Sequence, residues 1–317
     1  MGLRTKHVPI INKDSKVVWY GTRIAILVII LIILNIFRSM PHVSEIKYIN
    51  VGIPTAFNGT KIVHISELNN SSINVVKHVK DLEPQIIIVS GGFDDANGNY
   101  NNSAKTISAL TDIAPVYVIY NETDTPGSMS GTGAIELNNT GIGVKPVEVD
   151  KTTFINNMYG SDIISEYNRG NETTISFVND ILKQYDESLN SEIMIYGLNA
   201  DDKEMLSNGT FNIAVISNYN DINDKSKKYV NMLLASGLDK DSDYKSGWYN
   251  NNGTDIFITS GLNGEKSFLP QIQLITIYNT DVEPSTPLEK FLDKFVKKVD
   301  AKHTSDRLDI GPVNLGN

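Results

Sequence analysis

Carboxylates and amides that could hold a divalent cation follow five apolar runs of the sequence. Glu67 and Asn69 follow the run at 61–66, "GGFDD" follows the run at 85–90, and "NETD" follows the run at 115–120. Asn218 follows 211–217, and "GLDKD" follows 229–236. Oxygen ligands of this kind suit Mg²⁺, Mn²⁺ or Ca²⁺. These residues could form a metal site, or they could simply begin polar loops.

The runs that precede these residues are typical of strands in one α/β domain over residues 56–285. "QIIIVS" at 85–90 is continuously apolar, which is typical of a strand covered on both faces. Residues 73–82 and 103–113 carry helical stripes between the strands, so a parallel sheet with right-handed crossovers is expected. Ligands of such folds bind at the carboxyl ends of the strands.

The second half of the domain shows a less regular pattern. Residues 134–150 predict short strands or a loop, and 173–189 carry one apolar helical face. Five further strands are predicted at 192–197, 211–217, 229–236, 255–260 and 271–278. "SGWY" at 246–249 is either a contact surface or a packed loop.

The N-terminal region predicts a membrane anchor over residues 17–37. "IAILVIILIILNIF" at 24–37 covers about 21 Å, short of a hydrocarbon core of about 30 Å, and extension to Val17 reaches a spanning length. Arg23 could snorkel from that extension. Because most basic residues precede the run, residues 1–16 are expected to be a cytoplasmic tail and the chain after about residue 40 extracytoplasmic. A cleaved signal peptide is the alternative, but no A-x-A-like site follows the run.

The remaining segments and the composition limit the possible functions. Residues 38–55 are expected to be a linker, 286–303 an amphipathic helix docked on the domain or lying on the membrane, and 304–317 a flexible tail. The net charge of −9 and the lack of a basic, aromatic-rich stripe do not favour nucleic acid binding. The absence of cysteine excludes thiolate metal sites, cysteine nucleophiles and disulfides. Frequent Asn, Lys and Ile are typical of an AT-rich bacterial genome.

The ordered strand-end motifs resemble those of the calcineurin-like metallophosphoesterase family, over nearly the whole extracytoplasmic part. The family has D-x-H after its first strand and G-D-x-x-D after its second. Here Glu67 and Asn69 stand at the first Asp and His. Gly92 stands at the Asp that bridges two metal ions, and Asp95 stands at the later Asp.

The later motifs depart further from the family pattern. Asn121 matches the Asn of G-N-H-[DE], whereas Glu122 replaces its His. Asn218 replaces a lone His. Leu238 and Lys240 replace the two histidines of G-H-x-H. Lys240 could supply charge in place of a metal by pairing with Glu67 or Asp95, or it could point to solvent.

The resemblance implies an α/β/β/α sandwich of two mixed sheets and, in intact members, hydrolysis of phosphate esters by a metal-bound hydroxide. Without the bridging carboxylate and the imidazoles, this chain is expected to be a pseudoenzyme without a cofactor. It would then bind or scaffold an extracytoplasmic protein or envelope ligand. His64 lies inside a strand and is expected to be a core residue.

Two other functions stay open. One is an active phosphoesterase with a single divalent metal (Mg, Mn or Ca) and an atypical oxygen-ligand site. Its candidate ligands are Glu67, Asp94, Asp95, Asn121, Glu122 and Asp239. The other is an unrelated extracytoplasmic α/β binding protein.

Overall fold

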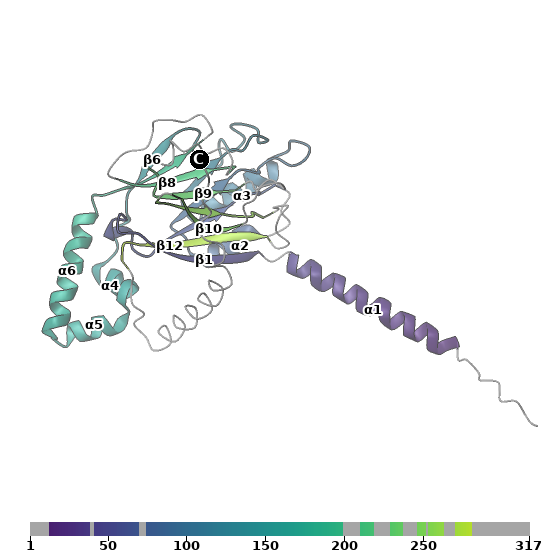
Figure 1. Ribbon diagram of the computed structural model, residues 1–317, viewed down its shortest axis with the longest axis horizontal. Coiled ribbons are helices and arrows are strands. Elements are labelled where there is room, and N and C mark those ends of the chain that lie inside the picture. Colours follow the sequence, from purple (N-terminus) through teal and green to yellow (C-terminus); the bar gives the residue numbers. More distant parts are fainter. Residues whose placement is uncertain are drawn as a thin grey trace, which may run out of the picture.

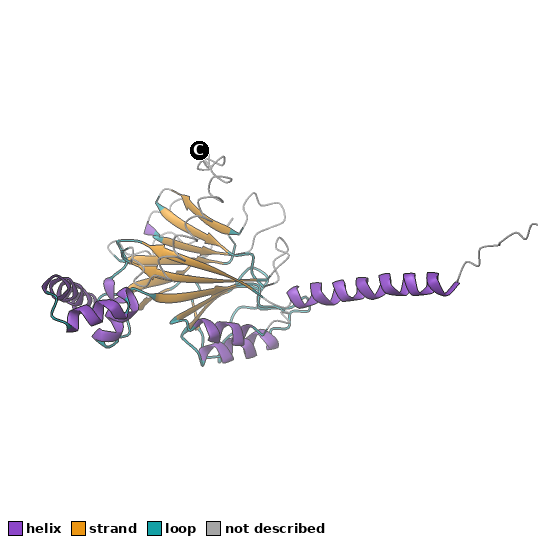
Figure 2. Cartoon of the chain, turned by 90° about the horizontal axis from the view of Figure 1, so that it is seen from below, coloured by secondary structure: helices purple, strands orange, loops and turns teal. Residues whose placement is uncertain are grey.

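The computed structural model describes residues 13–38, 41–69, 74–198, 210–218, 229–236, 246–251, 253–262 and 270–280. Two six-stranded sheets lie face to face, and helices lie beside one sheet and at one end of the pair (Figures 1 and 2). Both sheets contain parallel and antiparallel neighbours, so the expectation of two mixed sheets is confirmed.

Sheet A has the strand order β1-β12-β2-β3-β4-β5. Its strands are β1 (His42–Ile49), β2 (Thr60–Ile65), β3 (Ile86–Ser90), β4 (Val116–Ile119), β5 (Ile135–Glu136) and β12 (Gln271–Tyr278). β2 to β5 run parallel to one another, β12 is antiparallel to β2, and β1 is parallel to β12. The carboxyl ends of β2, β3 and β4 therefore meet at one end of this sheet.

Sheet B has the strand order β10-β11-β9-β8-β7-β6. Its strands are β6 (Gly141–Val144), β7 (Ile193–Gly197), β8 (Phe211–Ile216), β9 (Met232–Ala235), β10 (Gly247–Asn251) and β11 (Thr254–Ile258). β7, β8, β9 and β11 are parallel, and the two edge strands β6 and β10 are antiparallel to their neighbours.

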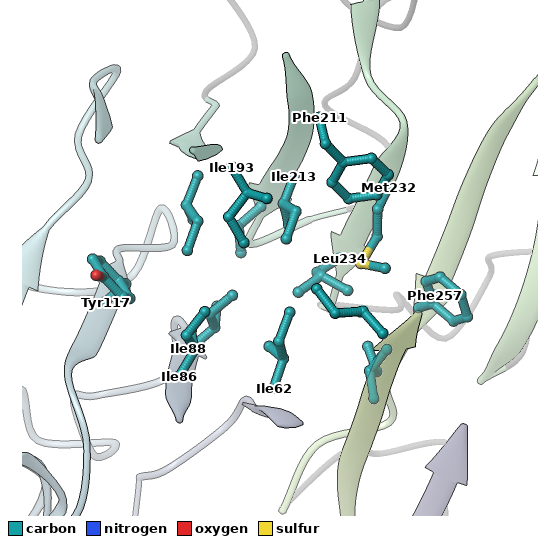
Figure 3. Close-up of a cluster of buried hydrophobic side chains, with 14 of the residues drawn as sticks. Ile62, Ile86, Ile88, Tyr117, Ile193, Phe211, Ile213, Met232, Leu234 and Phe257 are labelled. Carbon is teal, nitrogen blue, oxygen red and sulfur yellow. The ribbon is translucent and has the colours of Figure 1, made fainter. Parts of the chain in front are cut away.

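The main core fills the space between the two sheets. Because side chains alternate across a strand, Ile62 and Ile88 point toward sheet B, while Val63 and Ile87 face the helices. Figure 3 shows Ile86, Ile88 and Ile62 of sheet A opposite side chains of sheet B that include Ile213 and Leu234. The continuous apolar runs thus form strands that are covered on both faces, as predicted.

Two helices cover the outer face of sheet A. These are α2 (Val75–Leu82) and α3 (Asn101–Thr111), whose apolar sides pack on β2, β3 and β4. Asn74 caps the start of α2, with its Oδ1 accepting from the N–H of Lys77 at 3.2 Å. α2 ends at Leu82, and the capping residue Glu83 adopts a left-handed conformation just before Pro84.

Three further helices form the helical arm, defined as α4 (Lys151–Tyr159), α5 (Ser161–Asn168) and α6 (Glu172–Ser188). Phe154 and Tyr185 stack inside the arm with ring centroids 4.1 Å apart. The arm joins the sheets where β12 ends, because Tyr278 packs against its core and Ser188 Oγ accepts from the N–H of Ala56 at 2.6 Å. The arm therefore lies at the end of sheet A opposite to the carboxyl ends of β2 to β4 (Figure 1).

α1 (Lys13–Arg38) projects away from the sheets, at the end opposite to the helical arm (Figures 1 and 2). Apolar side chains along it are exposed, with Ile24 at 64%. Judged over the side chains that the structure describes, none of the helices combines the length and apolar character needed to cross a bilayer. The predicted anchor, residues 17–37, extends beyond those side chains at both ends, so it stays a prediction.

Three features correct the sequence-based picture. The expectation of a linker over residues 38–55 is wrong for 42–49, which form β1 and pair along their whole length with β12. α4 and α5 were not predicted at all. The last three residues of "SGWY" belong to the edge strand β10, where Trp248 is 58% exposed and stacks on Phe257. The predicted helix over 286–303 and the tail over 304–317 lie outside the described residues.

Candidate functional site

The candidate site lies at the carboxyl ends of β2, β3 and β4, where three loops meet. Glu67 N–H donates to Gly91 O at 3.1 Å, and Asn69 N–H donates to Gly92 O at 2.6 Å. Asn69 also donates from Nδ2 to Asp94 O at 3.0 Å. The loop after β2 is thus bound along the loop after β3, and the predicted juxtaposition of these two segments is present.

Glu67 occupies the place where a side chain at residue 92 would begin. A Cβ added to Gly92 would lie 2.5 Å from Glu67 Cα and 2.8 Å from Glu67 Oε2. Glu67 itself has a φ of +54°, which costs a residue with a side chain about 1–3 kcal/mol. On its other side, a Cβ at Gly261 would lie 2.9 Å from Glu67 Cγ. Glu67 is therefore packed between two glycines: a side chain at Gly92 would meet the Glu67 backbone, and one at Gly261 would meet the side chains of Ser66 and Glu67.

Asp95 and Asn121 use their oxygens to close their own turns. Asp95 Oδ1 accepts from the N–H groups of Asn97 and Asn99 at 2.8 and 2.9 Å. Asn121 Oδ1 accepts from the N–H groups of Thr123 and Asp124, both at 2.9 Å. These are side-chain-to-backbone turns that short polar residues favour. Both residues lie at the strand ends as predicted, but these oxygens point into their own loops.

The other predicted residues are distributed as follows. Glu122 is exposed in the loop after β4, and Asn218 is half-buried after β8. Leu238, Asp239 and Lys240 lie outside the described residues, so the hypothesis that Lys240 pairs with Glu67 or Asp95 stays a prediction.

Asp124 holds two of the loops together, a role that the sequence analysis missed. Its Oδ1 accepts from the N–H groups of Phe93 and Asp94 at 2.6 and 3.3 Å. Its Oδ2 accepts from the N–H groups of Gly92 and Asn121 at 3.0 and 2.8 Å. Burial raises the pKa of the Asp124 carboxyl above its usual value, and the four N–H donors oppose that shift. The signal in the sequence was an Asp three residues after Asn121, together with a Gly-Gly pair after the preceding strand.

Asp94 lies beside Asp124, and only one of its two carboxylate oxygens accepts hydrogen bonds. Its Oδ2 accepts from the N–H and the hydroxyl of Thr125. Its Oδ1 is buried and has no hydrogen-bond partner. The residue as a whole is 8% exposed. Because an unpaired buried acceptor carries a desolvation cost, Asp94 would gain from an added donor, as would the Ser66 and Ser128 hydroxyls, which are also buried without a partner.

A buried polar network connects the two sheets directly beneath the loops. His64 Nδ1 lies 3.0 Å from Gln273 Oε1, and His64 Nε2 lies 2.7 Å from Ser90 Oγ. Ser90 Oγ is in turn 3.0 Å from Ser236 Oγ of sheet B. Gln273 offers only its carbonyl oxygen, since its Nε2 donates to Ile258 O, so Nδ1 of His64 must carry the proton.

Burial sets the charge of this network. It lowers the pKa of His64 to about 4, against the hydrogen bond that the ring donates to Gln273 Oε1, which favours the protonated ring. His64 is therefore neutral at physiological pH and joins the sheets as a core residue, which confirms the sequence-based interpretation of this histidine.

Over the part of the chain that the structure describes, no group of three or more His, Cys, Asp or Glu side chains is arranged to hold a metal ion. Glu67 fills the space in which a bridging carboxylate would begin, and the oxygens of Asp124 accept four backbone N–H groups. The described residues therefore do not fit a pair of bridged metal ions.

Comparisons with known proteins add a distant similarity. No family model matches the chain, and no curated protein sequence matches it. Among solved structures the chain is similar to the crystal structure of TT1561 of Thermus thermophilus, at 10% sequence identity and a TM-score of 0.31. The alignment covers 65% of this chain and 91% of that chain. At this identity and TM-score, the similarity does not assign the chain to a family.

Proposed function

We propose that this chain is a single-pass membrane protein whose extracytoplasmic domain is a binding or scaffold module on a metallophosphoesterase-like α/β/β/α framework. The domain does not hydrolyse phosphate esters. Its ligand is an extracytoplasmic protein or another component of the cell envelope. The ordered strand-end motifs and the two facing mixed sheets support the framework, and the apolar run with its preceding basic residues supports the anchor.

The contact between Glu67 and Gly92 carries the proposal of lost catalysis. Two-metal hydrolysis requires a carboxylate that holds both cations a few ångströms apart. Gly92 stands at that position in the motif, and Glu67 Cα and Oε2 occupy the space that a side chain there would need. Gly92 therefore does more than remove a metal ligand, because Glu67, at the end of the neighbouring strand β2, occupies the space of the missing side chain.

One observation favours the alternative of an active hydrolase with an atypical metal. Asp94 Oδ1 is a buried acceptor without a hydrogen-bond partner. A single hard cation could satisfy this oxygen, with further oxygens from the same loops.

Metal content and hydrolysis of a generic phosphodiester, measured on the purified full chain with Mn²⁺ added, separate the two hypotheses. The binding-module proposal expects less than stoichiometric metal and no turnover above the buffer rate. Glu67→Ala and Asp94→Asn are the test variants, and Glu148→Gln, which alters an exposed carboxylate outside the site, is the matched control. Stoichiometric metal, with turnover that Glu67→Ala abolishes and Glu148→Gln retains, contradicts the proposal.

A further inference from the structure

The direction of β1 places its first residue at the same end of the domain as the candidate site. His42 pairs with Gln271, and the N–H of Gln271 donates to Gly261 O at 2.9 Å. Gly261 is the glycine against which Glu67 packs. Three contacts, from His42 to Gln271, then to Gly261 and then to Glu67, lead across this end of the domain. At about 4.8 Å each, the spacing of neighbouring strands, they put His42 within roughly 15 Å of Glu67.

Only a short segment separates β1 from the predicted anchor. α1 ends at Arg38 and β1 begins at His42. A chain of this length spans at most about 14 Å when it is fully extended. α1 leaves the domain opposite to the helical arm in both views (Figures 1 and 2). An anchor at this position holds the strand-end loops close to the membrane and the helical arm away from it.

We propose that the strand-end face, defined as loops 66–69, 91–100 and 121–131, is turned toward the membrane that holds α1 and binds amine-bearing lipid headgroups there. This inference rests on the proposed anchoring and names the ligand of the same site. Strand direction and the short segment before β1 fix the orientation, and the chemistry of the loops selects the headgroup.

The charge of the strand-end face selects a cationic group. These loops contain no Lys or Arg, and their carboxylates are Glu67, Asp94, Asp95, Glu122 and Asp124. Anionic headgroups within a Debye length of about 8–10 Å are repelled by such a face, whereas an ammonium group is attracted. Asp94 adds a buried acceptor without a partner, Oδ1, which an ammonium donor would satisfy.

The absence of cysteine allows a direct test of orientation. Asn97→Cys places one label on the strand-end face, and Asn168→Cys places a matched label at the end of α5 in the helical arm; both positions are exposed. The full chain is reconstituted into phosphatidylethanolamine–phosphatidylcholine vesicles whose headgroups carry an acceptor dye. Strands of five to eight residues separate the two ends by about 17–26 Å, so energy transfer from residue 97 is expected to be at least twofold higher than from residue 168.

A zero-length crosslink tests the headgroup itself. A carbodiimide joins a carboxylate to a primary amine as an amide, while the reagent takes up the water and becomes a urea. In phosphatidylethanolamine vesicles, lipid adducts are expected on Glu122 or Glu67 and not on Glu172 of the helical arm, and Glu122→Gln is expected to lose the adduct at its own position. Phosphatidylcholine vesicles, which offer no primary amine, measure the background.

The outcomes separate this inference from the proposed function. If carbonate at high pH extracts the full chain from the vesicles, there is no anchor, and both proposals fail. If the chain stays in the bilayer but residue 168 transfers energy as strongly as residue 97, the orientation is refuted and the anchored module stands. A membrane-proximal strand-end face without phosphatidylethanolamine adducts overturns the headgroup assignment.

Discussion

Adding one methyl group to Gly92 tests whether Glu67 closes the space in which a side chain at residue 92 would begin. Gly92 has a φ of +75°, a left-handed conformation that costs a residue with a side chain about 1–2 kcal/mol. The new Cβ would also lie 2.5 Å from Glu67 Cα, and such overpacking costs a further 1–3 kcal/mol or so. Gly92→Ala is therefore expected to lower the free energy of unfolding by about 2–5 kcal/mol.

Gly98 provides the matched control for this change. Its φ is +73°, but a Cβ added there meets no atom within 4 Å. Gly98→Ala is therefore expected to lose only the backbone contribution of about 1–2 kcal/mol. Urea unfolding of the full chain, followed by circular dichroism, gives both values as shifts of the midpoint at constant m.

Two results would refute the reasoning about Gly92. One is an equal loss in the two alanine variants, because the steric contribution is then absent. The other is full rescue of Gly92→Ala by Glu67→Ala, since the nearest atom is the Cα of residue 67, which alanine retains.

Three further predictions concern the network, the loops and the arm. Because the folded pKa of His64, about 4, lies below its usual 6.5, the unfolded chain binds the proton first; stability is expected to fall by up to about 3 kcal/mol from pH 6.5 to 4. His64→Gln removes this component of the pH dependence in urea titrations, whereas the contribution of Asp124 is common to both proteins and cancels. Asp124→Asn turns an NH₂ group toward two N–H donors, so it is expected to lower the free energy of unfolding, measured by thermal unfolding, by about 2–3 kcal/mol. The exposed control Asp112→Asn is expected to lower it by less than about 0.5 kcal/mol. Tyr185→Phe loses the hydrogen bonds between its hydroxyl and the N–H and carbonyl of Val149, at 2.8 and 3.1 Å; faster amide exchange is expected in α4–α6 and unchanged exchange in β3.

The strands of the central sheet positions could be predicted from the sequence, whereas the edge strands β1 and β10 could not. "QIIIVS" is apolar throughout because β3 has neighbours on both sides and layers on both faces. β1 is "HVSEIKYI", whose polar residues reflect one solvent-exposed edge, so its pattern resembles a linker. β10 could not be recognised as a strand for the same reason, since Trp248 is largely exposed and the segment lacks a buried apolar pattern.

The convergence of the three strand ends at the candidate site was predictable, but the geometry of their loops was not. Alternating strands and helices place Glu67, Gly92 and Asn121 at one end of a parallel sheet, and the structure places them there. The left-handed conformation of Glu67 and its contact with Gly92 depend on the fold of two separate loops. The role of Asp124 was missed for a related reason, because its four partners are backbone groups that the residue types do not reveal.

The position of β12 in sheet A has a consequence for folding of the protein during its synthesis. β12 separates β1 from β2, so β1 has no neighbour in sheet A until β12, the last of the described strands, emerges. β12 follows β1 by roughly 230 residues, a delay on the order of 10–50 s at typical rates of synthesis. Throughout that time β2 presents an open edge of apolar residues, the kind of surface that chaperones protect and aggregates recruit.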